Sequence, residues 1–206
     1  MQGYAPGGRD VVFIPVAMNY DRVLEDRILV SAAKAGERRF RAGIRTIFAF
    51  LMRNLWRKLR GRFRRFGTAA VSFGAPLSLA EFLTGAGERS TEALAGELMD
   101  RVRRIVPVLP VPLTAAALRD DPDTDIGGTE GRAASILARL EAGGAQLTLP
   151  PGGAAAAVSA GLDELVRRRI VLRDGNQLHV ADHNRAVIGF YAGSILQLLE
   201  KESSGT

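Results

Sequence analysis

The order of three segments near the N-terminus constrains the fold more than any other feature of this sequence. Residues 11–18 form a continuous apolar run rich in β-branched side chains, which predicts a strand buried on both faces. Pro15 within the run favours an edge or bulge position. A long segment of helical periodicity follows, and residues 69–73 predict a second short strand. Strand, helix and strand in this order favour a right-handed parallel crossover, so we expect residues 1–84 to form part of an α/β domain.

The segment between the two predicted strands is strongly basic. Residues 34–65 contain 12 Lys or Arg against one acid, Glu37, which gives this segment a charge of +11. The whole chain carries +6, so the remaining residues sum to −5. Apolar residues recur at helical spacing between Phe40 and Phe63, with arginines largely on the other side. The pattern predicts a cationic amphipathic helix over residues 38–65.

Two interpretations of this helix remain open. A basic face beside Phe, Leu and Trp is the composition of a helix lying among lipid headgroups, where each Lys or Arg near an anionic surface contributes roughly 1 kcal/mol. In the other interpretation the apolar face packs on the sheet and the arginines stay in solvent or reach phosphates. The membrane interpretation assigns lipid contact to Arg41, Arg45, Phe48, Leu51, Arg53, Leu55, Trp56, Arg57, Lys58 and Arg60.

Residues 85–206 predict a second, mainly helical domain with a small hairpin. Asp174, Gly175 and Asn176 predict a hairpin over residues 170–180, because Asp-Gly supplies the positive backbone angles of a tight turn. The stretch 106–118 carries three prolines and no charge, which predicts an extended segment leading into a short helix, and residues 120–128 predict an acidic loop. Helical spacing marks residues 91–106 with Thr91 as N-cap, 132–141, 162–169 and 185–199.

The composition gives little support for a metal, a cofactor or thiol chemistry. The chain of 206 residues contains no cysteine, which excludes disulfides and thiolate ligands. His179 and His183 stand four residues apart, a spacing that binds zinc on a helix, but they fall at the edge of the predicted hairpin without a third ligand. No run of about 20 apolar residues free of Gly, Pro and charge is present, as a spanning helix requires. We therefore expect no cofactor, no metal and no membrane span.

Two blocks of the sequence resemble the family of glycerol-3-phosphate and dihydroxyacetone-phosphate acyltransferases. Residues 12–30, VFIPVAMNYDRVLEDRILV, are similar to its last conserved block, in which an apolar strand ending in Ile/Val-Pro-Val/Ile runs into Tyr-Asp/Glu-Arg-Val/Ile-Leu-Glu. Residues 71–83, VSFGAPLSLAEFL, are similar to the following strand and Phe-Gly-x-Pro turn. Phe190, Tyr191, Ser194 and Ile195 resemble a late Tyr-Tyr-x-Asn-x-Ile pattern.

The resemblance implies acyl transfer from acyl-CoA or acyl carrier protein to the 1-hydroxyl of glycerol 3-phosphate in phospholipid synthesis. The family's catalytic motif is a His followed, after four residues, by an Asp, and neither His179 nor His183 opens such a motif. We therefore expect the chain to be the inactive C-terminal portion of an acyltransferase, with residues 1–84 as the C-terminal part of its α/β domain and the missing N-terminal catalytic part as its partner. Whether Met1 is the true start stays open. The basic helix implies a peripheral location at an anionic surface, on the cytoplasmic face of the cell membrane.

The resemblance also implies a substrate site in the first block. Carried over by position, Ile14, Pro15, Val16 and Tyr20 line the acyl or polyol-phosphate pocket. A core role competes with this assignment for Ile14 and Val16. Arg22 is assigned either a phosphate contact or a surface ion pair with Asp26 at helical spacing.

Two other functions remain as alternatives. Helices followed by a hairpin across residues 130–181 describe a winged-helix-like module, and with an isoelectric point near 10.4 this raises nucleic-acid binding. The main positive cluster lies in the other half of the chain, so no nucleic-acid partner is expected. The second alternative is a noncatalytic membrane-binding protein descended from the enzyme.

Overall fold

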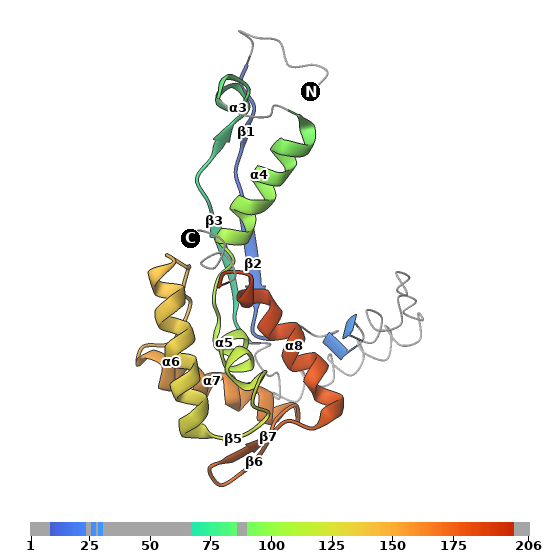
Figure 1. The fold of residues 1–206 in the computed structure, drawn as a ribbon, viewed down its shortest axis with the longest axis vertical. Helices are drawn as coiled ribbons and strands as arrows, with labels where there is room; N and C mark the ends of the chain where they lie inside the picture. Colours follow the sequence, from blue (N-terminus) through green and yellow to red (C-terminus); the bar gives the residue numbers. More distant parts are fainter. Residues whose placement is uncertain (1–8, 24–25, 28, 31–66, 86–89, 200–206) are drawn as a thin grey trace, which may run out of the picture.

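The computed structural model describes residues 9–23, 26–27, 29–30, 67–85 and 90–199 of the chain (Figure 1). A narrow β-ribbon with two helices occupies one end of the molecule, and a helical domain with a small sheet occupies the other. The combination of helices and small sheets is compatible with the predicted α/β class. The predicted basic helix over residues 38–65, with its ten assigned lipid contacts, lies outside the described residues.

The ribbon consists of two antiparallel pairs of strands. Strand β2 (Val16–Tyr20) pairs with β3 (Ala69–Phe73), and β1 (Val12–Phe13) pairs with β4 (Leu77–Ser78). The predicted parallel crossover is therefore wrong, because the chain leaving β2 returns beside it in the opposite direction. Residues 14–15 lie opposite residues 74–76, so the register shifts by one residue between the pairs. Pro15 sits at this irregularity, where no ladder N–H is needed.

One face of the ribbon is covered, and the other is open. Ala17 and Asn19 point inward and are buried, whereas Val16, Met18 and Tyr20 are exposed. The prediction of a strand buried on both faces is wrong for the described structure, and so is the core role considered for Ile14 and Val16, both of which are exposed. Along β2, exposed and buried side chains alternate, as the pleat of a strand requires.

Two helices follow the ribbon. Helix α3 (Leu79–Thr84) is capped by Ser78, whose hydroxyl accepts a hydrogen bond from the Glu81 N–H at 3.1 Å. Helix α4 (Thr91–Arg104) is capped by Ser90, whose hydroxyl accepts from the Ala93 N–H at 3.1 Å. The predicted N-cap at Thr91 is therefore wrong by one residue. A small core joins these helices to the ribbon; its buried members are Leu77, Leu79 and Leu94.

The helical domain is built around one completely buried helix. Helix α5 (Pro110–Leu118) has every residue buried, and it begins at a proline, whose missing N–H costs nothing in a first turn. The extended stretch predicted before it is confined to residues 106–109. Three helices pack against α5, namely α6 (Ile126–Ala142), α7 (Gly153–Arg167) and α8 (Asp182–Leu196).

A small antiparallel sheet closes the far end of this domain. Its strand order is β5 (Asp123–Asp125), β7 (Gln177–His179), β6 (Leu172–Asp174). The predicted hairpin is confirmed, with Gly175 at φ +57° in the turn. The predicted acidic loop is wrong in part, because it contains β5 and the start of α6, which the Asp125 carboxylate caps by accepting from the Gly128 N–H at 2.6 Å.

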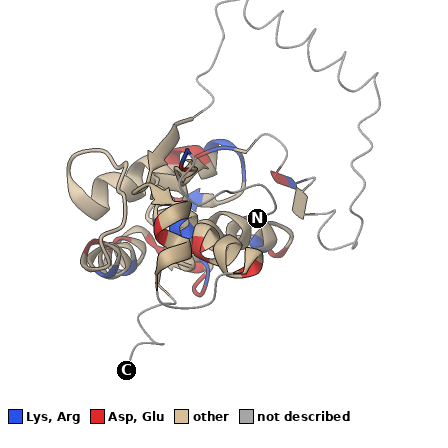
Figure 2. Cartoon of the chain, turned by 90° about the horizontal axis from the view of Figure 1, so that it is seen from above, with Lys and Arg blue, Asp and Glu red and all other residues tan. Residues whose placement is uncertain are grey.

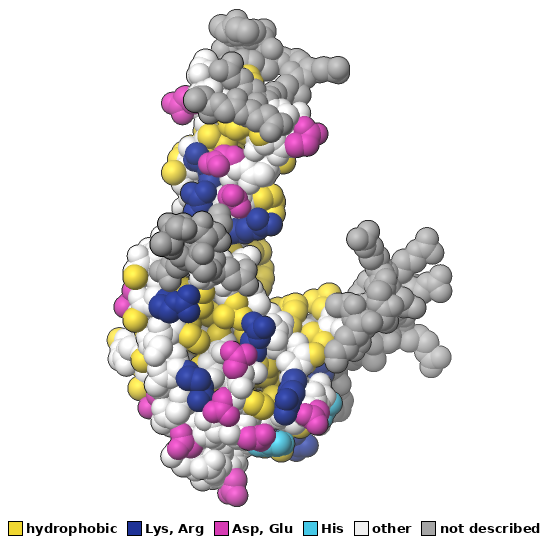
Figure 3. Space-filling model, in the orientation of Figure 1, with side chains coloured by type: hydrophobic (Ala, Val, Ile, Leu, Met, Phe, Trp, Pro, Cys, Tyr) yellow, Lys and Arg dark blue, Asp and Glu magenta, His cyan; other side chains and the backbone are white. Residues whose placement is uncertain are grey.

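Acidic and basic positions alternate along the described part of the chain in Figure 2, and their side chains are interspersed on the face that Figure 3 shows. Several of them form pairs one helical turn apart, such as Arg101 with Glu97 at 2.7 Å and Arg103 with Asp100 at 3.2 Å. No separate basic patch stands out over the helical domain on the face that Figure 3 shows. The basic excess of the sequence therefore belongs to residues 34–65.

Helix α7 starts nine residues before its predicted position. Its first turns consist of Gly and Ala, which carry no large apolar side chains to mark a face, although Ala favours helix strongly. Small residues here allow α7 and α5 to approach closely. A Cβ atom added at Gly161 would lie 2.1 Å from Thr114 Oγ1 and 2.7 Å from the Pro110 carbonyl oxygen.

We predict that Gly161→Ala lowers the free energy of unfolding by roughly 3 kcal/mol, because the added methyl group forces α5 and α7 apart. The matched control is Gly131→Ala in α6, where an added Cβ meets nothing within 4 Å. Its stability should stay unchanged or rise by up to about 1 kcal/mol. Urea unfolding followed by circular dichroism measures both. Equal stabilities of the two variants would contradict the close helix crossing.

Candidate functional site

The segment that follows β2 enters the helical domain through buried polar side chains. Asn19, Asp21 and Asp26 are all buried. The Asn19 side-chain amide donates to the Pro107 carbonyl at 2.9 Å, and the Asp21 carboxylate accepts from the Val111 N–H at 2.9 Å. Because buried polar groups are costly without partners, these contacts fix how the ribbon joins the start of α5.

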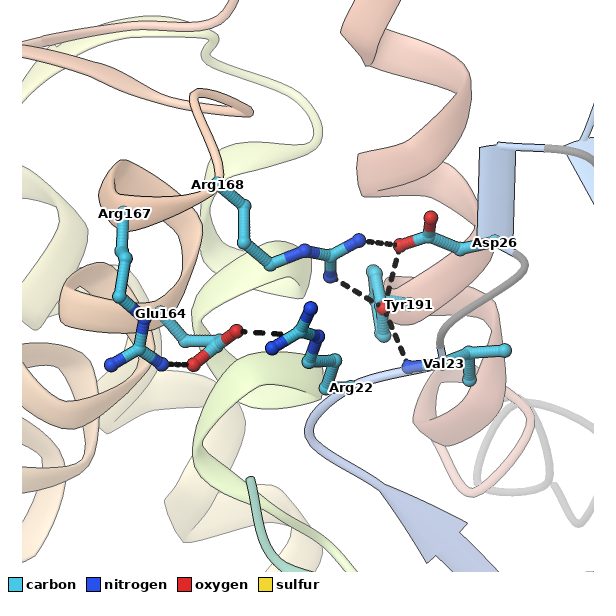
Figure 4. A network of polar contacts seen from close by, with 7 residues as sticks. All are labelled: Arg22, Val23, Asp26, Glu164, Arg167, Arg168 and Tyr191. Carbon is cyan, nitrogen blue, oxygen red and sulfur yellow. Dashed lines mark hydrogen bonds and ion pairs between the residues drawn. The ribbon is translucent and has the colours of Figure 1, made fainter. Parts of the chain in front are cut away.

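Asp26, Arg168 and Tyr191 form a second buried cluster, which we call the Asp26 clamp (Figure 4). The Tyr191 hydroxyl donates to Asp26 Oδ2 at 2.7 Å and accepts from the Val23 N–H at 3.0 Å and from Arg168 Nη1 at 2.8 Å. Arg168 also forms an ion pair with Asp26, and its guanidinium lies 5.8 Å from the centre of the Tyr191 ring. Each of these three side chains contacts the other two, so the clamp holds the segment in position.

Burial and the contacts of the Asp26 clamp keep Tyr191 protonated and Arg168 charged. Burial raises the pKa of Tyr191, so its hydroxyl keeps the proton that it donates to Asp26. Burial alone would lower the pKa of Arg168, but its contacts with Asp26 and Tyr191 raise the pKa overall. The clamp therefore places the Arg168 cation beside the neutral Tyr191 phenol.

Arg22 lies next to two charged side chains of α7, Glu164 and Arg167. Its Nε atom is 4.0 Å from Glu164 Oε1, and Arg167 contacts the other carboxylate oxygen of Glu164 (Figure 4). The predicted ion pair of Arg22 with Asp26 is wrong, because Asp26 pairs with Arg168. The phosphate contact assigned to Arg22 stays a prediction.

A cavity of about 440 Å³ opens beside this junction. Its described lining includes Asp21, Thr68, Asp163, Glu164 and Arg167. Burial raises the pKa of Asp21 above its ordinary value of 3.8, against the hydrogen bond from Val111. Three carboxyl side chains beside one arginine disfavour a phosphate ligand, so the part of the lining that the structure describes does not match a polyol-phosphate site.

The residues assigned to the substrate site lie elsewhere. Ile14, Val16 and Tyr20 are on the exposed face of the ribbon and Pro15 is buried beside it, and none of the four lines the cavity. Their assignment as substrate-binding residues stays a prediction. No sequence pattern marked Asp21, Arg168 or Tyr191 as a site residue. Tyr191 could have been found from its position in the segment that resembles the late Tyr-Tyr-x-Asn-x-Ile pattern of the family.

The described residues offer no group of three or more His, Asp or Glu side chains that could hold a metal ion. His179 contacts Asp123 across β5 and β7, and both side chains are largely exposed. None of the described helices is both long enough and apolar enough to cross a membrane.

Comparison with known proteins identifies relatives of one kind. The family model described as "Glycerol-3-phosphate acyltransferase C-terminal region" matches residues 52–199. The chain is 28% identical over 214 residues to a glycerol-3-phosphate acyltransferase of Ectopseudomonas mendocina, a match covering 91% of this chain and 24% of that relative. It is 40% identical over 76 residues to the protein of the same name from Pseudomonas syringae pv. syringae, covering 36% and 8% of the two chains. The chain thus spans about a quarter of the length of the first relative.

We predict that Tyr191→Phe lowers the free energy of unfolding by about 2 kcal/mol, because Asp26, Arg168 and the Val23 N–H each lose a buried partner. The control is Tyr20→Phe, which removes an exposed hydroxyl in contact with Met18. Its effect should stay within about 0.5 kcal/mol. Denaturant unfolding of both variants measures the difference, and an equally small loss for Tyr191→Phe would argue against the clamp.

Proposed function

We propose that this chain, which belongs to the glycerol-3-phosphate acyltransferase C-terminal region family, is part of an O-acyltransferase. The enzyme moves an acyl chain from acyl-CoA or acyl carrier protein to the 1-hydroxyl of glycerol 3-phosphate. The observation that carries this proposal is the family match over residues 52–199. The names of the relatives from Ectopseudomonas mendocina and Pseudomonas syringae support it.

In this proposal the chain supports the reaction without performing it. The sequence holds two histidines, and neither is followed by Asp after four intervening residues. The general base must then come from a catalytic part of the enzyme outside this sequence. The role left to the chain is to hold the block at residues 12–30 in place, and the Asp26 clamp is the device that does so.

The assigned substrate residues fit this division of labour. Ile14, Val16 and Tyr20 point away from the helical domain, and Arg22 lies at the junction beside Glu164. Side chains presented in this way can complete a site whose remaining walls belong to the catalytic part. Pro15, buried between β1 and β2, fixes the course of the strand that carries them.

We further propose that residues 38–65 hold the enzyme peripherally at an anionic membrane, on the cytoplasmic face. The support is the charge of +11 over residues 34–65 together with the apolar periodicity from Phe40 to Phe63. The same charge would attract an acidic acyl carrier protein.

The order of elements from α5 to β7, with the strand order β5-β7-β6, supports a winged-helix-like arrangement for the helical domain. We assign this module to protein contacts. Its helix α7 exposes Ala155, Ser159, Ala160 and Asp163, and its one exposed basic residue, Arg167, lies at its end, whereas a helix that reads DNA needs several basic and hydrogen-bonding side chains. The nucleic-acid alternative therefore has little support from this surface.

The test of the acyltransferase proposal uses two proteins. We expect the purified chain, given glycerol 3-phosphate and acyl-CoA or acyl carrier protein, to form no acyl-glycerol phosphate. A chimera in which this chain replaces the matched segment of the Ectopseudomonas mendocina relative should form it. Turnover by the isolated chain would contradict the supporting role. A folded chimera that transfers no acyl group from either donor would contradict the function.

For the membrane proposal, we predict that the chain floats with anionic vesicles, that 0.5 M salt weakens binding roughly tenfold or more, and that duplex DNA does not compete. The triple variant Arg41→Glu, Arg45→Glu and Arg53→Glu should stay in the lower fraction. A matched control reverses three exposed arginines elsewhere: Arg104→Glu, Arg119→Glu and Arg173→Glu. Equal flotation of the two triple variants, or displacement by DNA, would overturn the assignment.

A further inference from the structure

One face of the β2–β3 ribbon exposes a continuous set of large apolar side chains. The exposed fractions are 42% for Val16, 55% for Met18, 41% for Tyr20, 51% for Val71 and 72% for Phe73. They alternate with inward residues along both strands, and the register places Val16 opposite Phe73 and Met18 opposite Val71. These five residues, which we call the ribbon face, therefore lie side by side.

An apolar ribbon face is unusual for an antiparallel sheet that ends in solvent, because outward positions there are normally polar. Contiguous exposed apolar side chains on a stable protein mark a surface that another element covers. A two-stranded ribbon is also marginally stable by itself. The residue types thus match a strand pair covered on both sides, while the described structure covers one side.

The opposite side of the ribbon is already occupied. Asn19 donates to the Pro107 carbonyl at 2.9 Å and to Ser194 Oγ at 3.2 Å, and Ser72 donates to the Ile105 carbonyl. A Cβ added at Gly74 would lie 3.3 Å from the Ile105 side chain. These contacts fix the ribbon against α4 and α8, so the ribbon face is held in a defined orientation and cannot turn inward.

The outer edge of β3 offers backbone hydrogen bonds beside the ribbon face. Within the ribbon the Asp21 N–H donates to the Thr68 carbonyl, and the Gly74 N–H donates to the Pro15 carbonyl, both at 2.9 Å. Alternation along an antiparallel ladder then turns the backbone groups of Ala69, Val71 and Phe73 outward. In the described part of the chain, β2 and β3 pair only with each other, so this edge can accept a further strand.

We propose that the ribbon face is the docking surface for the catalytic part of the acyltransferase, which covers the five side chains and adds a strand along β3. This inference rests on the proposed function. The relative from Ectopseudomonas mendocina supports this occupant, because three quarters of its length lies outside the matched segment. A partner that supplies an apolar layer and a strand fits both the side chains and the edge, and it brings the reacting groups to Ile14, Val16 and Tyr20.

The absence of cysteine allows a direct test with single thiols. Val71→Cys places a thiol on the ribbon face, and Met99→Cys places one on α4 at nearly the same exposure, 51% against 52%. Maleimide labelling of Val71→Cys should be roughly tenfold or more slower in the chimera with the Ectopseudomonas mendocina relative than in the isolated chain, because the covered thiol reacts only after local opening. The Met99→Cys rate should be the same in both proteins. Equal Val71→Cys rates would overturn the proposal.

Two further measurements keep the outcomes distinct. If the chimera does not fold, the remaining part of the relative is added to the isolated chain as a separate polypeptide, and unchanged Val71→Cys labelling there also overturns the proposal. Labelling of the isolated chain that slows with concentration, with a doubled mass in light scattering, assigns the face to a second copy and rejects the catalytic part. A protected thiol in a chimera without acyl transfer supports docking and contradicts the proposed function. An active chimera with an unprotected thiol supports the proposed function and contradicts docking.

Discussion

The hydrogen bond from Tyr191 to Asp26 determines how the two ends of this molecule are joined. It connects residues 165 positions apart in the sequence, and Asp26 is almost completely buried. A buried carboxylate without partners is strongly unfavourable, so the folded state depends on Tyr191 and Arg168 being in place. Because Tyr191 also binds the Val23 N–H, the clamp fixes the backbone that leaves β2. Together with the contacts of Asn19 and Asp21, the clamp sets the orientation of the ribbon against the helical domain.

Features that depend on local physics could be predicted from the sequence. The hairpin at Gly175 follows from turn chemistry, and the helices α4, α6 and α8 follow from the spacing of large apolar residues. The start of α7 could not be predicted, because Gly and Ala leave no apolar stripe to mark it. The predicted parallel crossover was wrong because the direction of β3 relative to β2 depends on the path of the intervening segment, which local pattern does not encode.

The candidate site also combines a part that the sequence predicts with partners that it does not predict. The resemblance located the block at residues 12–30, whose short apolar strand and Tyr-Asp-Arg sequence are contiguous. Its partners could not be predicted, since Glu164 and Arg168 come from a helix and its end some 140 residues later. Neither residue belongs to a motif, and an arginine at a helix end is normally solvated. Only the packing of α7 and α8 around α5 brings them to Asp26 and Arg22.

The connectivity of the ribbon links the proposed membrane contact to the proposed docking face. Residues 31–66 leave the described structure after Val30 and return at Gly67, and Tyr20 and Ala69 are paired across the ribbon. The segment that carries the basic excess therefore leads directly into the strand that carries Val71 and Phe73, and its other end follows Val30, which packs against the core of the helical domain. Since the Asp26 clamp fixes that element on the helical domain, binding of residues 38–65 to an anionic surface would hold the ribbon face beside the membrane. A catalytic part docked there would meet an acyl donor and deliver its lipid product at the same surface.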